Sequence, residues 1–258
     1  MTKLQWIIIA SGLVLFGVLF FGFSPKPKKI AGIERKRAIE TQVTDINNLI
    51  RAVQKNLTAD QKSYLIALEK EIESSENESN KLSLLKRLSG KWFEYQQPHI
   101  AGFYAEKVAD IENTVDAWSI AGTTYAATFK SVLEKKAKDY AFSRAIAAFE
   151  NAISLDPDLI QSKINLALSY VEYPPSDNPM KGILMLVDLN KQHPDQPLIL
   201  TNLGRLAIQT GQYERAIERL ESVLKIEPDN KRAFCLLAQV YSETGNQERA
   251  DHYQKQCS

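Results

Sequence analysis

The sequence predicts an all-α protein with an apolar N-terminal segment and a body built from repeated helix pairs. Helix-interrupting residues are scarce, since glycine contributes 11 and proline 10 of the 258 residues, fewer than in an average chain. Apolar residues recur at helical spacing along most of the chain, and small residues recur at an interval close to 34. With 44% hydrophobic and 24% charged residues, the composition is globular rather than disordered.

An uncharged apolar run opens the chain and extends from Leu4 to Phe23. A helix of this length rises about 30 Å, which matches the hydrocarbon thickness of a bilayer. The run is also longer than the apolar core of a signal peptide, which has about 7–15 residues. We therefore expect residues 1–25 to be an uncleaved transmembrane anchor, with residues 4–23 inside the membrane, rather than a cleaved signal peptide.

A basic juxtamembrane linker follows at residues 26–37, after Pro25 ends the apolar helix. Basic residues flanking a span tend to stay in the cytoplasm, so the linker predicts a cytoplasmic body. The N-terminal tail is short enough to defeat this rule, which leaves an extracytoplasmic body as the alternative. The linker lysines are also expected to attract anionic lipid headgroups; they are Lys26, Lys28 and Lys29.

Residues 38–80 show a helical pattern with two interpretations. Apolar residues alternate in steps of four and three, as in a heptad seam; they are Ile39, Val43, Ile46, Ile50, Val53 and Leu57. Thr58 and Gln61 then have the spacing of a capping box that begins a second helix. The segment is either a helical hairpin that packs on the body, which we favour, or a short coiled coil.

The rest of the chain contains an internal repeat. Small residues are separated by 37, 34 and 34 positions, at Ala145, Gly182, Ala216 and Ala250. A proline follows each of the first three after twelve residues, at Pro157, Pro194 and Pro228. Chance similarity between amphipathic helices does not explain this fixed step to a helix-ending proline.

These residues resemble the tetratricopeptide repeat, a 34-residue helix–turn–helix unit. The best copy has Gly204 and Ala216 where its helices approach, Gly211 in the turn and Pro228 at its end. The resemblance implies an α-solenoid of about four repeats over residues 81–258. The copies are expected at 117–158, 160–195, 197–230 and 231–258, with a weak one at 82–115.

The first of these four copies departs from the family pattern. Tyr125 and Ala145 lie 20 residues apart, eleven more than the family spacing implies. We expect the extra residues to lengthen the two helices of this repeat rather than to form a loop. The order of anchor, basic linker, hairpin and repeats also resembles a group of bacterial membrane-anchored repeat proteins. That resemblance implies a single-pass protein of the bacterial inner membrane.

The sequence offers little chemistry for catalysis. It has no phosphate-binding, nucleotide-binding, nucleophile-elbow or zinc-protease motif. A net charge of +1 argues against binding nucleic acid through bulk charge. Cys235 and Cys257 are expected to be small buried hydrophobes, with a disulfide only in an oxidising compartment. We therefore predict a non-enzyme without a cofactor or metal site.

The family resemblance implies that the first helices of the repeats line a groove for partner peptides or helices. The residues expected to face it are Gln161, Ile164, Leu168, Thr201, Arg205, Gln209, Arg232 and Gln239. Apolar residues with two arginines suit a peptide that has an apolar anchor and an acidic group. Family members that clamp chaperone tails use lysine–asparagine pairs, which are missing here.

The sequence thus predicts a membrane-tethered scaffold that binds a partner protein in its groove. Two alternatives remain: a structural component that forms homo-oligomers in an envelope assembly, and an extracytoplasmic assembly factor for unfolded clients.

Overall fold

The computed structural model describes residues 46–131 and 133–257, and in this part of the chain all regular secondary structure is helical, with no strand. The chain divides into two compact units, residues 1–53 and 54–258. The predicted anchor and basic linker lie outside the described residues. Among the helices that the structure does describe, none is both long and apolar enough to cross a membrane.

The described N-terminal helices match the expected break near residue 57. One helix covers residues 46–54, and α3 follows at Ala59–Ser74. The predicted capping box is present: Thr58 Oγ1 accepts from the amide of Gln61 at 3.2 Å, and Gln61 Oε1 accepts from the amide of Thr58 at 2.9 Å. The first two residues of the heptad seam, Ile39 and Val43, lie outside the described residues, so the choice between hairpin and coiled coil stays a prediction.

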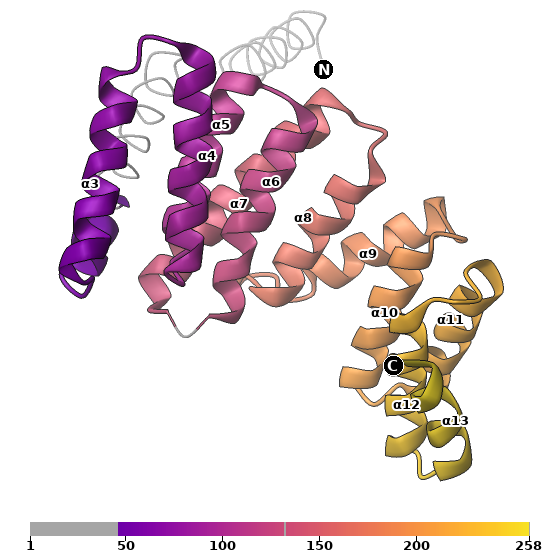
Figure 1. The fold of residues 1–258 in the computed structure, drawn as a ribbon. Helices are drawn as coiled ribbons and strands as arrows, with labels where there is room; N and C mark the ends of the chain where they lie inside the picture. Colours follow the sequence, from indigo (N-terminus) through magenta and orange to yellow (C-terminus); the bar gives the residue numbers. More distant parts are fainter. Residues whose placement is uncertain (1–45, 132, 258) are drawn as a thin grey trace, which may run out of the picture. The chain divides into compact units, whose positions relative to one another are not determined.

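Five antiparallel helix pairs follow one another from α4 to α13 (Figure 1). The pairs are α4 Glu78–Glu94 with α5 Pro98–Glu112, α6 Val115–Ala126 with α7 Lys135–Leu155, α8 Ile160–Glu172 with α9 Lys181–Gln192, α10 Pro197–Gln209 with α11 Tyr213–Ile226, and α12 Lys231–Glu243 with α13 Gln247–Cys257. These pairs overlap the residues at which the five copies are expected, and the division of the chain into domains stays a prediction.

The helices of each pair approach closely because a glycine or alanine lies between them. A Cβ atom added at Gly122 would stand 2.6 Å from the ring of Phe149, and one at Gly204 would stand 2.9 Å from Leu220. The turns also depend on glycine: Gly211 and Gly245 have φ values of +71° and +78°, which other residues rarely adopt.

The eleven extra residues of the second pair do not simply lengthen both of its helices, as was expected. Helix α6 has only 12 residues and is followed by a short 3-10 helix, η1, at Ala127–Lys130. The rest of the insertion extends α7 at its N-terminal end, to 21 residues. The expectation of two longer helices is therefore wrong for α6. Aromatic stacking holds the insertion, since Phe129 lies 5.7 Å from Tyr173 and 5.9 Å from Phe142 between ring centroids.

A buried polar network joins α5, α6 and α7. The hydroxyl of Tyr125 donates to Glu106 Oε2 at 2.6 Å, and Arg144 Nε donates to the same oxygen at 3.0 Å. Arg144 also forms an ion pair with Glu106. Burial raises the pKa of the Tyr125 phenol well above its usual value, so this group stays a donor to the carboxylate.

The two cysteines are not the separate small hydrophobes that the sequence suggested. Cys235 on α12 and Cys257 on α13 form a disulfide, with their Cα atoms 4.8 Å apart. The antiparallel pairing of the last two helices brings positions 22 residues apart into the range that a disulfide needs. The bond fastens the last helix of the array, in which only Ala250 is buried.

A glycine substitution tests the close approach of the helices. Gly182 faces backbone, because an added Cβ would lie 2.5 Å from the carbonyl oxygen of Ala167 and from the amide nitrogen of Val171. We expect Gly182→Ala to lower the free energy of unfolding by about 1–3 kcal/mol. Gly90→Ala is the matched control within a helix, because nothing lies within 4 Å of its added Cβ, and it should raise stability by about 0.5–1 kcal/mol. Urea unfolding measures both, and equal effects would contradict the packing argument.

The burial of His99 leads us to expect that the folded protein loses stability in mild acid. The His99 side chain is 1% exposed, and within the described chain neither ring nitrogen has a hydrogen-bond partner. Burial lowers the pKa of His99 to about 4 in the folded protein, against 6.5 in an unfolded chain. The unfolded state therefore binds a proton first, and stability falls as pH drops from 6.5 towards 4.

The lowered pKa of His99 corresponds to a decrease of up to about 3 kcal/mol in the free energy of unfolding near pH 4. His99→Leu has no titrating group, so its thermal midpoint should change less over the same pH range than that of the unaltered protein. Parallel pH profiles for the two proteins would show that His99 does not carry the effect.

Candidate functional site

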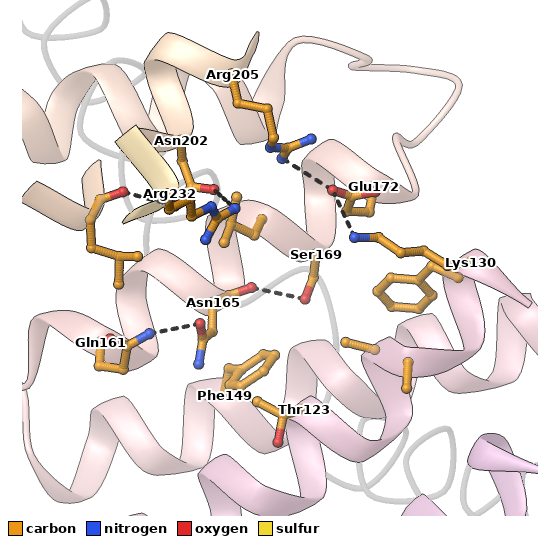
Figure 2. A pocket seen from close by; sticks show the side chains of 15 residues that line it. Thr123, Lys130, Phe149, Gln161, Asn165, Ser169, Glu172, Asn202, Arg205 and Arg232 are labelled. Atoms are coloured by element: carbon orange, nitrogen blue, oxygen red, sulfur yellow. Dashed lines mark hydrogen bonds and ion pairs between the residues drawn. The ribbon is translucent and has the colours of Figure 1, made fainter. Parts of the chain in front are cut away.

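A hollow of about 480 Å³ lies on the face formed by the first helices of the last four pairs (Figure 2). Its walls come from α6, η1, α8, α10 and α12, and Phe149 of α7 also lines it. We call it the polar hollow; its lining residues are Thr123, Ala126, Ala127, Phe129, Lys130, Phe149, Gln161, Asn165, Leu168, Ser169, Glu172, Leu198, Asn202, Arg205 and Arg232.

One carboxylate and three cations share this hollow. Glu172 Oε1 lies 3.1 Å from Arg205 Nη2 and 3.6 Å from Lys130 Nζ, and Figure 2 shows Glu172 between the two cationic groups. Arg232 belongs to neither ion pair; it donates a long 3.5 Å hydrogen bond to Asn202 Oδ1. The lining therefore has a net positive charge.

Arg205 is the most enclosed of the cations. Its side chain is 21% exposed, and its Nε is buried without a hydrogen-bond partner in the part of the chain that the structure describes. A guanidinium can donate five hydrogen bonds in a planar fork, which fits a carboxylate in two-point contact. Arg205 thus retains donor capacity beyond its bond to Glu172.

Amide side chains line the hollow next to the charges. Gln161 Nε2 donates to Asn165 Oδ1 at 2.9 Å. Asn202 is 1% exposed, and its Nδ2 donates to the carbonyl oxygen of Leu198 at 2.8 Å. This bond orients Asn202 Oδ1 towards Arg232 (Figure 2). Asn202 thus links Arg232 to the backbone of α10.

The lining of the polar hollow also has an apolar part. Phe149 on α7, Leu168 on α8 and Leu198 on α10 contribute to it, and Phe129 joins them from the insertion. Such a surface can bind a segment that has both an acidic group and apolar side chains. None of these features supplies a nucleophile with a base, and among the described residues no group of three or more His, Cys, Asp or Glu could hold a metal ion.

Half of the residues predicted to face the groove line the polar hollow: Gln161, Leu168, Arg205 and Arg232. Ile164 and Thr201 were placed wrongly. Ile164 is fully buried in the core between α8, α9 and α10, and the hydroxyl of Thr201 is 2% exposed and donates to the carbonyl oxygen of Pro197. Gln209 and Gln239 are exposed but lie outside the hollow.

The wrong placement of Ile164 and Thr201 comes from the way in which α8 and α10 are rotated about their axes. On α8 the hollow is lined at positions 161, 165, 168 and 172, and on α10 at 198, 202 and 205, in steps of four and three that mark one helix face. Positions 164 and 201 lie one residue before this stripe and turn into the core. Steps of three and four from Gln161 and Arg205 reach Asn165 and Asn202 but equally Ile164 and Thr201, so the spacing alone does not separate the lining residues from the core. Nothing in the repeat pattern pointed to Lys130, which the insertion supplies.

Paired antiparallel helices stacked in series, with a binding hollow on their first helices, define a repeat protein of the α-solenoid class, whose members use such surfaces to bind other proteins. Residues 183–240 and 207–252 match the tetratricopeptide repeat family. Residues 183–252 thus contain tetratricopeptide repeats, and they include α10 and α12, which carry Arg205 and Arg232.

Solved structures with a similar fold include PilW, described as a widely conserved type IV pilus biogenesis factor. It is 18% identical, with coverage of 70% of this chain and 77% of that one and a TM-score of 0.47. MamA of AMB-1 is 19% identical, covering 70% and 91% with a TM-score of 0.39, and MamA of MSR-1 is 20% identical, covering 69% and 94% with a TM-score of 0.40. These likenesses concern the helical fold alone. No curated protein matches the chain.

Proposed function

We propose that this protein is a membrane-tethered scaffold that holds an acidic segment of a partner protein in its polar hollow. The observation that carries the proposal is the charge of the lining, three cations against one carboxylate beside an apolar part. A partner carboxylate that contacts Arg205 and Arg232 would reduce this excess. Charge-assisted bonds to arginine are among the strongest hydrogen bonds in proteins.

We propose the membrane tether from the sequence alone. Residues 4–23 would cross the membrane and the basic linker at 26–37 would lie at its surface. The alternatives stay predictions: a structural component that forms homo-oligomers, and an assembly factor for unfolded clients. The absence of enzymatic activity likewise stays a prediction.

We also propose that the body lies in an oxidising, extracytoplasmic compartment. The Cys235–Cys257 disulfide supports this, because disulfides persist in such compartments and are rare in the cytoplasm. Oxidation transfers two electrons from the thiols, with loss of two protons, to the disulfide of a thiol oxidoreductase. The basic linker at residues 26–37 favours the opposite orientation.

Photo-crosslinking in cells tests the polar hollow. A photo-reactive phenylalanine at position 161, which is exposed and lines the hollow, should give a discrete partner adduct. Arg205→Glu with Arg232→Glu should reduce that adduct at least tenfold, because two charge-assisted contacts are reversed. Arg205→Gln with Arg232→Gln should act in the same direction without placing a new carboxylate next to Glu172.

The matched control reverses two exposed charges of the second helix α11, with Arg215→Glu and Lys225→Glu; its adduct should be unchanged. A photo-reactive residue at position 184 on α9, which is 53% exposed and outside the hollow, should give a different adduct or none. Adducts that survive both arginine variants would exclude the polar hollow as the binding site.

The cysteines give a separate test of compartment, since the chain contains only two. Cells are quenched in acid, and the denatured full chain is treated with a polyethylene-glycol maleimide. An extracytoplasmic body should show no mass shift before reduction and two additions after it. Cys257→Ser leaves one thiol and should show one addition without reduction. Two additions to the unreduced chain would place the body in the cytoplasm.

A further inference from the structure

A second hollow, of about 650 Å³, lies between α4 and α6 with α5 as its floor. We call it the apolar hollow, because its lining includes Gly90, Phe93, Ala105, Val108, Ala117 and Ile120. Gly90 has no side chain, and nothing approaches within 4 Å of the position that its Cβ would occupy. The hollow therefore has room for a side chain that the described part of this protein does not supply.

Two large apolar side chains stand open at this hollow. Phe93 on α4 is 49% exposed, and Ile120 on α6 is 60% exposed. Leaving such side chains in water costs about 25 cal/mol for each Å² of apolar surface that binding could bury. Exposed apolar residues that converge on one hollow, rather than being scattered singly, mark an interaction surface.

The rim of the apolar hollow has one cation and two carboxylates, so its net charge is opposite in sign to that of the polar hollow. Lys86 forms a 2.6 Å ion pair with Glu112, and Asp116 adds a carboxylate nearby. There is no excess positive charge here to recruit an acidic group. The two hollows thus select for different chemistry, one for an apolar side chain and the other for a carboxylate.

Helix α6 separates the two hollows and lines both. Ile120 and Thr124 line the apolar hollow, whereas Thr123 and Ala126 line the polar hollow. A helix with its side chains is about 10 Å across, and an extended chain advances about 3.3 Å per residue. An extended segment laid across α6 would therefore pass from one hollow to the other in three or four residues.

We propose that both hollows bind one partner segment, which has an apolar residue in the apolar hollow and an acidic residue three or four positions away in the polar hollow. The apolar residue contacts Phe93 and Ile120, and the carboxylate pairs with Arg205 and Arg232. This inference rests on the proposed function, because it extends the same bound segment across α6. The occupant is a protein segment rather than a lipid or a second copy, because its charge complements the arginines and its length spans one helix.

Peptide display tests the paired requirement. The full chain is immobilised and used to select from a library of random 12-residue peptides displayed on phage. Selected sequences should combine Asp or Glu with Leu, Ile, Met or Phe at a separation of three or four residues. Enrichment of either residue class alone, or at no fixed separation, would overturn the proposal of one segment in two hollows.

The best selected peptide is then synthesised with and without its apolar residue. Replacing that residue by glycine should weaken binding to the unaltered chain about tenfold or more, as expected when a large apolar side chain loses its contact. The Ile120→Asp chain should bind the original peptide about as weakly. In this variant, replacing the peptide's apolar residue by glycine should have almost no further effect on affinity. Leu184→Asp on α9 is the matched control, since Leu184 is 53% exposed and lies in neither hollow.

The outcomes separate this inference from the proposed function. A peptide that depends on Arg205 and Arg232 but binds the Ile120→Asp chain unchanged would overturn the two-hollow arrangement and leave the polar hollow as the site. A selection that yields no binding peptide, or peptides indifferent to the arginines and to Ile120, would overturn both proposals.

Discussion

Close approach of neighbouring helices is the constraint on which the rest of the structure depends. At Gly122 and Gly204 the facing helix contributes Phe149 and Leu220, and at Gly182 it contributes backbone. A side chain at any of these positions would occupy space already filled by the neighbour. The helices could then not lie as close together as they do. The distance between helices sets the tilt and rotation of each first helix, and hence which of its residues reach the surface where Arg205 and Glu172 meet.

The rotation of the first helices explains why a shift of one residue matters for binding. On α10, Asn202 and Arg205 lie on the stripe that lines the polar hollow, whereas Thr201 lies just beside it and is 2% exposed. Adjacent positions on a helix differ by about 100°, which is enough to move a side chain from a surface into a core. The chemistry of the hollow is thus determined by helix packing rather than by the number of polar residues in the helix.

Periodic features were predictable from the sequence, and features that break the period were not. The interval near 34, the turn at Gly211 and the capping box at Thr58 follow local rules, and all appear in the structure. The identity of the groove residues depends on how each helix is rotated, which a period of 3.6 residues defines only to within one position. The Cys235–Cys257 bond required the three-dimensional distance between α12 and α13, because a separation of 22 residues alone does not distinguish a pair from two buried thiols.

The insertion in the second pair turns a regular array into one with a particular site. A uniform set of repeats offers equivalent positions along its first helices, so nothing distinguishes one binding place from the next. Here η1 ends in Lys130, which lies 3.6 Å from Glu172 on α8, and Phe129 stacks on Tyr173 just beyond the end of that helix. The insertion thereby encloses the polar hollow on one side, and the short α6 that precedes it forms the boundary with the apolar hollow. The departure from the repeat therefore coincides with the point where two different chemistries meet, which is where selectivity for a partner is expected.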